Sequence, residues 1–315
     1  MRDSDLRLGL IGAGRWGRIY IKTLKNVAGV RLARLASSNP DSPNLVDEDC
    51  QITTDWTAVA EAGDLDGIII ATPPSLHAEM ARATIEAGNP VLIEKPLTMD
   101  LGEARQLLAF AEQSGAIALV DHIHLYHPAW RALKRLGLGL GPVHAIRSAG
   151  GNYGPFRKDA PVLWDWASHD VALCVDLMGG MPETVSAEIR ETRETEDGPG
   201  ETIATKLTFP GGVTADIENG NLMKQKKRFT AVHYDRDTLI YDDVAAAKLM
   251  REPRSDDANC APSHAEVIAV AATLPLVQVI EDFAAAIRKG MPDIGGLRLG
   301  VQVVEVLSEA EASCR

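Results

Sequence analysis

Three side chains have the chemistry and spacing needed to move a proton at a hydroxyl group. Lys95 follows the apolar run Val91–Ile93 within Glu94-Lys95-Pro96, and a cation there would stabilise the alkoxide that develops in hydride transfer. Asp165 and His169 are four residues apart, so on a helix they share a face, where a carboxylate can orient an imidazole for acid–base work. We therefore predict that these three are catalytic. The alternatives are a salt bridge from Lys95 to Glu94 or Asp121, and a buried, locally satisfied His169.

A glycine-rich turn lies about eighty residues before Lys95. Its sequence is Gly12-Ala13-Gly14-Arg15-Trp16-Gly17, after a predicted strand and before a predicted helix. Here the glycines permit a tight turn, close approach of backbone to a pyrophosphate, and close packing of helix on strand. The free N–H groups of the helix start attract phosphates. The sequence thus predicts a nicotinamide dinucleotide site.

Further cofactor contacts are expected where later strands of the same sheet end. Thr72-Pro73 follows the strand at 67–71, and His77 stands in the first turn of the next helix. A helix-start histidine satisfied by local groups is an equal alternative for His77. The predicted cofactor contacts are Gly12, Gly14, Arg15, Trp16, Gly17, Ser37, Ser38, Thr72, Pro73, His77, Glu94 and Lys95.

The end of the second strand should distinguish NAD from NADP. An acid there would bind the ribose 2′-hydroxyl, and a basic residue would favour a 2′-phosphate. The chain has Ser37, Ser38 and Asn39 instead, which could hydrogen-bond either group. The missing acid removes the repulsion against NADP, so the cofactor is NAD or NADP with a slight preference for NADP.

Further candidates for metal or substrate binding lie near the predicted boundary between the two domains. Asp121, His122, His124, Tyr126 and His127 invite a metal hypothesis, but no acid–histidine set with ligand spacing completes it, so we expect no metal. Alternation would place His122, His124 and Tyr126 on one face only if the run were extended. The predicted substrate contacts are Lys95, Tyr126, Asn152, Tyr153, Asp165 and His169.

The elements that position these residues change character near residue 122. Before it, short apolar runs at 6–12, 30–36, 67–71, 90–94 and 116–120 alternate with helical patterns, which predicts a parallel sheet. After it, consecutive strand-like runs with tight turns predict a mainly antiparallel sheet, with a helix at 164–178. We expect an α/β dinucleotide-binding domain over 1–122 and an α+β domain over 123–315. The last helix, 297–311, is a candidate to pack back on the first domain.

Composition narrows the class of protein. A net charge of −12 over 315 residues disfavours nucleic acid or an anionic membrane as the main partner. The four cysteines show no CxxC spacing, which favours a reduced, cytoplasmic compartment. The N-terminus lacks the pattern of a signal peptide, and no apolar run reaches the roughly 18 residues of a membrane span. The polar run at 190–202 is predicted to be a hairpin loop.

With these motifs in view, the chain resembles the Gfo/Idh/MocA family of oxidoreductases over nearly its whole length. The matching segments are LGLIGAGRWG, ATPPSLH, VLIEKPLTMD, DHIHLYHPAWRALK, DWASHD and VIEDFAAAIRKGMPDIGGLRLGVQVVE. The resemblance implies a Rossmann domain followed by a domain with an open antiparallel sheet. It also implies that Lys95, Asp165 and His169 are the catalytic set, and that the protein is a homodimer or homotetramer.

The resemblance further implies reversible oxidation of a secondary hydroxyl on a sugar, inositol or nucleotide-linked sugar. Two departures from the family pattern concern specificity: the second-strand end lacks both usual discriminators, and His127-Pro128 stands where relatives often have asparagine before the proline. Two other functions compete. One is a non-catalytic, cofactor-sensing regulator, disfavoured because Lys95 and His169 are both present. The other is an enzyme that retains its cofactor for another net outcome, such as aldose–aldose oxidoreduction.

Overall fold

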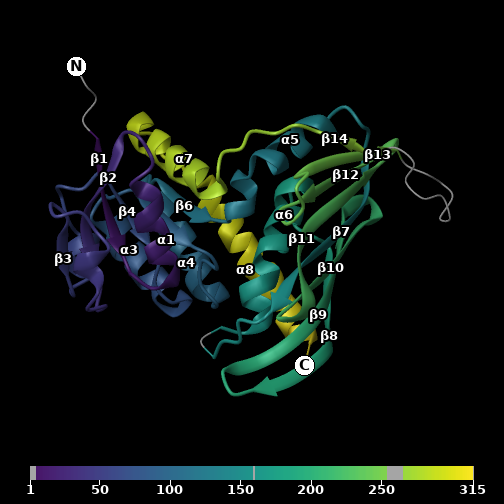
Figure 1. Ribbon diagram of the computed structural model, residues 1–315, viewed down its shortest axis with the longest axis horizontal. Helices are drawn as coiled ribbons and strands as arrows, with labels where there is room; N and C mark the ends of the chain where they lie inside the picture. The colour runs from purple at the N-terminus through teal and green to yellow at the C-terminus, as the bar shows by residue number, and fades with distance from the viewer. Residues whose placement is uncertain (1–4, 159, 254–264, 315) are drawn as a thin grey trace. The chain divides into compact units, whose positions relative to one another are not determined.

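The structure, a computed structural model, describes residues 5–158, 160–253 and 265–314. The chain forms two compact units, and Figure 1 names their elements. The first unit runs to Ile123 and includes Leu274–Val304. The second contains His124–Thr273 and the C-terminal part from Glu305.

The first unit is built on a six-stranded parallel sheet of order β3-β2-β1-β4-β5-β6, which confirms the predicted α/β class. The strands are β1 (Leu6–Ile11), β2 (Val30–Ala36), β3 (Gln51–Thr53), β4 (Gly67–Ile70), β5 (Val91–Glu94) and β6 (Ala118–Asp121). Strands β4, β5 and β6 are buried along their whole length, as expected where helices cover both faces. The order reverses between β1 and β4, the place where open α/β sheets bind ligands.

Helices cover both faces of this sheet. They are α1 (Arg15–Leu24), η1 (Ser42–Asn44), α2 (Thr57–Ala60), η2 (Pro74–Leu76), α3 (His77–Glu86), α4 (Leu101–Ser114) and α7 (Pro275–Lys289). A Cβ at Gly9 would lie 2.7 Å from Val59 of α2, and one at Gly67 would lie 2.7 Å from Ile287 of α7. Because Gly9 pairs with Ile68, its neighbour Gly67 faces the other side, so α2 and α7 cover opposite faces.

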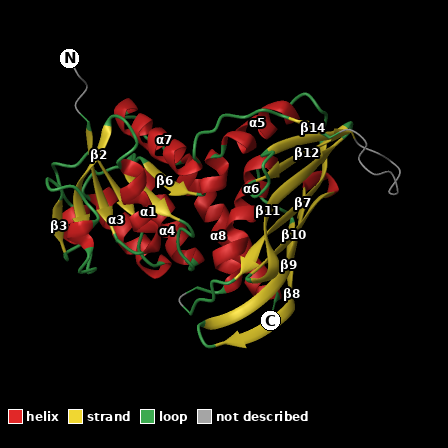
Figure 2. Ribbon diagram, in the orientation of Figure 1, coloured by secondary structure: helices red, strands yellow, loops and turns green. Residues whose placement is uncertain are grey.

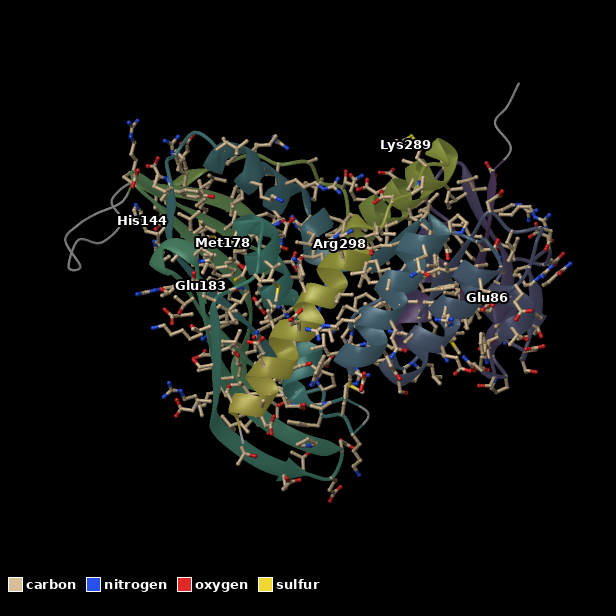
Figure 3. All side chains as sticks on the ribbon, turned by 180° about the vertical axis from the view of Figure 1, so that it is seen from behind. Glu86, His144, Met178, Glu183, Lys289 and Arg298 are labelled. Atoms are coloured by element: carbon tan, nitrogen blue, oxygen red, sulfur yellow. The ribbon has the colours of Figure 1, made fainter. Side chains whose placement is uncertain are left out.

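The chain returns to the first unit through α7 and the beginning of α8 (Gly295–Ser313). Gly296 and Gly300 of α8 bring the helix against β6, since added Cβ atoms would lie 3.3 Å from Leu119 and 2.8 Å from Val120. Arg298, labelled on α8 in Figure 3, forms a 2.8 Å ion pair with Glu112 of α4. The first unit thus gathers α7 as well as part of the last helix.

The second unit contains an eight-stranded sheet of order β14-β13-β12-β11-β7-β10-β9-β8. The strands are β7 (Val143–Tyr153), β8 (Thr184–Thr195), β9 (Gly198–Phe209), β10 (Val213–Gly220), β11 (Leu222–Tyr234), β12 (Asp237–Asp242), β13 (Leu249–Pro253) and β14 (Glu266–Val267). Only the pairing of β10 with β7 is parallel among the described strands of this sheet. The predicted mainly antiparallel sheet is confirmed.

The prediction of a loop at 190–202 is wrong. Strand β8 continues to Thr195 and β9 begins at Gly198, so Glu196 and Asp197 alone make the turn. The run is polar because β8 is the outermost strand of the sheet and its side chains are largely exposed. Polar composition at a sheet edge was mistaken for a loop.

Helices of the second unit pack against the sheet (Figure 2). They are α5 (Pro128–Gly137), the π-helical turn η4 (Leu163–Ala167) and α6 (Ser168–Met178). The predicted helix at 164–178 is therefore two elements of different winding. A hydrophobic core joins Trp130 of α5, Leu173 of α6 and Tyr241 of β12. Met178 and Glu183, labelled in Figure 3, bracket the turn from α6 to β8.

Across the described residues, no helix combines the length and the apolar character needed to cross a bilayer.

Candidate active site

The glycine turn between β1 and α1 has the shape of a phosphate cradle. Gly12 has φ of +101°, a conformation that side chains disfavour, and a Cβ there would lie 2.6 Å from the Ala71 carbonyl oxygen. A Cβ at Gly17 would lie 2.0 Å from the Gly12 carbonyl oxygen, so this glycine lets α1 approach the turn. A Cβ at Gly14 would meet nothing within 4 Å. The backbone at Gly14 thus faces open space at a helix start, which fits a bound pyrophosphate.

A cavity of about 510 Å³ opens beside this turn, within the range of ligand sites. Of the predicted cofactor residues, Gly12, Gly14, Ser37, Ser38, Thr72 and Pro73 line it. Arg15, Trp16, Gly17, His77, Glu94 and Lys95 are not among its lining residues. Arg18, Thr54 and Trp56 also line the cavity and were not predicted from the sequence. Arg18 directly follows the glycine motif, and that position was the available signal.

The loop after β2 presents hydroxyl groups to this cavity. The Ser37 hydroxyl accepts a 3.0 Å hydrogen bond from the Asn39 N–H, which fixes the turn. Ser38 is exposed at the cavity wall. The described lining residues contain no acid and include Arg18, so the wall suits a 2′-hydroxyl or a 2′-phosphate.

His77 is wholly buried and ties two segments of the first unit together. Its Nδ1 lies 2.9 Å from the Pro96 carbonyl oxygen and its Nε2 lies 2.8 Å from that of Thr72. Burial lowers the pKa of His77, and the hydrogen bonds to the two carbonyl oxygens oppose that shift. This is the locally satisfied helix-start histidine considered above. Its bonds hold the Thr72 turn against the segment that carries Lys95.

Lys95 leaves the end of β5 half-buried, beside two buried acids. The Glu94 Oε2 atom accepts a 3.1 Å hydrogen bond from the Lys95 N–H, and Glu94 pairs in register with Asp121 of β6. Tyr20 of α1 donates its hydroxyl hydrogen to Asp121 Oδ2. Burial and the Asp121 charge raise the pKa of Glu94 well above its ordinary value, whereas the Lys95 ammonium lowers it. Lys95 therefore adjoins a buried pair of carboxyl groups whose charge state depends on its own ammonium group.

The histidine-rich segment that follows β6 is not extended. Ile123–Tyr126 form a 3₁₀ turn, η3, so His122, His124 and Tyr126 do not share a face as they would in an extended run. In the first unit His122 is buried, and neither ring nitrogen has a hydrogen-bond partner among the described residues. Burial lowers the pKa of His122 to about 3. His127 instead caps α5, its Nδ1 accepting a 3.0 Å hydrogen bond from the Ala129 N–H.

Asp165 and His169 lie on either side of the junction between η4 and α6. π-Helical turns are rare and are frequently found at functional sites. Arg157 donates to Asp165 across 3.3 Å. The His169 ring packs edge-to-face on His124 with centroids 4.9 Å apart, and His124 Nδ1 is hydrogen-bonded to the Tyr241 hydroxyl at 2.8 Å. Asp165 thus has a cationic partner, and His169 has an aromatic one that is itself hydrogen-bonded.

Asp170, next to His169 at the start of α6, connects this helix to the sheet of the second unit. Its carboxylate accepts hydrogen bonds from Ser148 of β7 (2.5 Å), Asn219 of β10 (2.7 Å) and Arg228 of β11 (3.0 Å). The Arg228 guanidinium also lies 5.7 Å from the centre of the Trp166 ring. A Cβ at Gly150 would lie 2.3 Å from Arg228 Nη1, so only glycine leaves room for this ion pair. Three strands thus hold the residue next to His169.

The remaining predicted substrate contacts, Tyr126, Asn152 and Tyr153, belong to the second unit. Tyr126 packs against Arg131, whose guanidinium is 5.4 Å from the ring centre. Asn152 and Tyr153 end β7, and Tyr153 is exposed with its ring edge-to-face on Phe156, 5.5 Å away. In the described ranges, no group of three His, Cys, Asp or Glu could hold a metal ion. Cys260 lies outside the described residues.

The glycine cradle, the cavity and the strand order define a Rossmann dinucleotide-binding fold. The family model described as "Oxidoreductase family, NAD-binding Rossmann fold" matches residues 6–122, and that of the GFO/IDH/MocA C-terminal domain matches residues 113–240. The chain belongs to the Gfo/Idh/MocA family of oxidoreductases.

Known proteins resemble the chain over nearly its full length. UDP-N-acetylglucosamine 3-dehydrogenase of Acidithiobacillus ferrooxidans is 26% identical over 98% of both chains. Inositol 2-dehydrogenase of Rhizobium meliloti is 24% identical over 90% of this chain and 89% of its own. A solved structure of a protein from Magnetospirillum magnetotacticum MS-1, assigned provisionally to the oxidoreductases, is 42% identical with a TM-score of 0.91, over 98% of this chain and 100% of that one.

Proposed function

We propose that the protein transfers hydride between NAD(P) and a secondary hydroxyl or ketone of a sugar, inositol or nucleotide-linked sugar. Residues 1–122 would bind the dinucleotide, and residues 123–315 would bind substrate and form the oligomer, with α7 and the start of α8 returning to the first unit. The observation that carries the proposal is the Asp165–His169 pair on one π-to-α segment, fastened to the sheet through Asp170. A histidine fixed in this way can exchange a proton with a hydroxyl.

Each catalytic residue has a separate task. His169 takes the hydroxyl proton in oxidation and returns it in reduction, with Asp165 orienting the imidazole. The Lys95 ammonium stabilises the negative charge that develops on the oxygen. When bound, the nicotinamide supplies the acceptor or donor of the hydride.

The substrate class is supported by the relatives and by the charge beside Asp165. Two relatives are named for UDP-N-acetylglucosamine and inositol, both of which carry secondary hydroxyl groups. Arg157 at 3.3 Å from Asp165 offers a cation to a substrate's phosphate or hydroxyl groups. Tyr126, Asn152 and Tyr153 are the further substrate contacts of this proposal. A substrate panel should therefore include inositols, free sugars and nucleotide sugars.

We propose a slight preference for NADP over NAD. The absence of an acid among the described lining residues and the presence of Arg18 support it. Parallel titrations with NADPH and NADH, followed by energy transfer from tryptophan, test it. Trp56 lines the cavity, so Trp56→Phe should weaken the transfer signal. Tighter binding of NADH would reverse the assignment.

The catalytic roles are tested by turnover on the first active member of the panel. Lys95→Ala and His169→Asn should each lower kcat by about 10²–10⁴-fold while the affinity for cofactor stays nearly unchanged. Glu86→Gln, an exposed change at the end of α3, is the matched control. Near-normal turnover in Lys95→Ala would remove Lys95 from the chemistry.

We further propose a homodimer or homotetramer formed through the second unit's sheet. A hollow of about 820 Å³ lies over β7–β11, lined by cations such as Arg147 and Lys206 and by acids such as Asp216 and Glu218. Such a mixed surface suits an isologous contact, in which each charge meets its opposite on the partner. Light scattering after size-exclusion chromatography gives the mass, and a monomer would contradict the proposal.

A further inference from the structure

Two carboxyl groups lie buried next to each other where the parallel sheet of the first unit ends. Glu94 is the last residue of β5 and Asp121 the last of β6, and they are register partners, so both side chains point to the same face. They are 5% and 1% exposed. Tyr20, wholly buried on α1, donates to Asp121 Oδ2. Two buried carboxylates at one place would repel each other strongly.

The hydrogen bonds around this pair are too few for two carboxylates. Glu94 Oε2 accepts from the Lys95 N–H and Asp121 Oδ2 accepts from Tyr20. Within the described part of the chain, Glu94 Oε1 and Asp121 Oδ1 have no hydrogen-bond partner. Ionised carboxylates only accept hydrogen bonds, whereas a protonated carboxyl can also donate one. A single proton on one of these two oxygens, donated to the other, would satisfy both.

We propose that Glu94 and Asp121 share one proton at neutral pH and that this singly charged pair, held by Tyr20, positions the ammonium group of Lys95. Tyr20 from α1, which interacts with both carboxyl groups, and Lys95 at the end of β5 face the pair. His122, next to Asp121, is neutral because burial depresses its pKa.

The electrostatics assign the proton mainly to Glu94. Burial and the Asp121 charge raise the pKa of Glu94 well above its ordinary value. Burial also raises the pKa of Asp121, but the hydrogen bond from Tyr20 and the Lys95 charge oppose that rise. The resulting unit is neutral: a protonated Glu94, an ionised Asp121 and an ammonium on Lys95. This unit would keep the Lys95 cation where hydride transfer needs it, and that consequence rests on the proposed function. The shared proton between Glu94 and Asp121 does not depend on the proposed function.

Infrared spectroscopy of the full chain without substrate tests the shared proton. The wild type should show the C=O band of a buried protonated carboxyl at pH 7, shifted in D₂O, and Glu94→Gln should lose it. Glu86→Gln, exposed on α3, should keep it. Absence of the band in the wild type, or its survival in Glu94→Gln, would overturn the proposal.

Labelling of Lys95 tests the positioning. Acetic anhydride would be used at pH 7, with the Lys95 peptide quantified by mass spectrometry. Glu94→Gln should leave the rate of Lys95 labelling nearly unchanged, because Gln mimics an already neutral Glu94. Asp121→Asn should raise that rate several-fold, since it removes the anion that holds the ammonium in place. Equal labelling rates in the two variants would overturn the proposal. Neither measurement needs a substrate, so both outcomes are independent of the dehydrogenase activity.

Discussion

Replacing Arg228 by Met should destabilise the second unit by about 3 kcal/mol. The pair it forms with Asp170 is buried, with side-chain exposures of 8% and 0%. Removing one member of a buried pair leaves an uncompensated charge, which costs about 3–5 kcal/mol. The lower end applies because Ser148 and Asn219 still donate to the carboxylate. The equilibrium constant for unfolding should therefore rise about a hundredfold.

Urea unfolding followed by tryptophan fluorescence measures this effect. The matched control is Lys227→Met, the preceding residue on β11, whose pair with Glu218 is 45% and 52% exposed and 3.4 Å long. It should cost less than about 1 kcal/mol. Adding Asp170→Asn to Arg228→Met should restore stability, because the buried charge is then gone. Equal losses for Arg228 and Lys227, or no recovery in the double variant, would refute the idea that buried charge compensation holds this segment.

In the first unit, Asp121, the glycine turn and the N-terminal cap of α4 each give a test. Burial raises the pKa of Asp121 from 3.8 to about 6, so between these values the native state retains a proton that the unfolded chain has lost. The free energy of unfolding should therefore fall as pH rises through about 6. Urea unfolding at a series of pH values measures this fall, and Asp121→Asn should flatten it. Gly17→Ala should cost about 1–3 kcal/mol of stability in a thermal melt and abolish NAD(P)H binding, because its Cβ would lie 2.0 Å from the Gly12 carbonyl oxygen. Gly14→Ala should weaken NAD(P)H binding without a loss of stability. Unchanged binding in both variants would contradict the phosphate cradle. Asp100→Ala should cost about 1 kcal/mol by circular dichroism melting, because it removes the cap that accepts a 2.8 Å bond at the start of α4; no loss would show that the cap is dispensable.

Much of the first unit could be predicted because its signals are local. Strand β2 was expected at 30–36 and occupies Val30–Ala36, since an apolar run covered on both faces has a clear beginning and end. Helix α4 likewise has a local signal at each end, because Asp100 accepts a hydrogen bond from Glu103 N–H at its start and Gly115 ends it in the left-handed conformation. Strand β3 was missed because its three residues are mostly exposed and pair only with β2, so no hydrophobic pattern marks them.

The parts that escaped prediction depend on residues distant in sequence. Tyr20 meets Asp121 across 101 positions, and Arg228 meets Asp170 across 58. No spacing rule links such pairs. The π-helical winding of η4 also has no local signal, because the sequence around Asp165 shows the same periodicity as an α-helix. Trp56 entered the cofactor cavity from a loop region for which no contact was predicted.

Asp170 and Glu94 are buried acids that each adjoin a predicted catalytic residue, and the number of hydrogen bonds each accepts distinguishes a structural role from a role in proton exchange. Asp170 adjoins His169 and both of its oxygens are satisfied by donors from three strands, so it can remain ionised and rigid. Glu94 adjoins Lys95 and has too few donors, and the same is true of its partner Asp121. A fold that tolerates such a deficit needs a mobile proton to balance it, because an unpaired buried charge is too costly to keep. The first arrangement fixes a backbone, whereas the second can respond to pH and to a neighbouring cation.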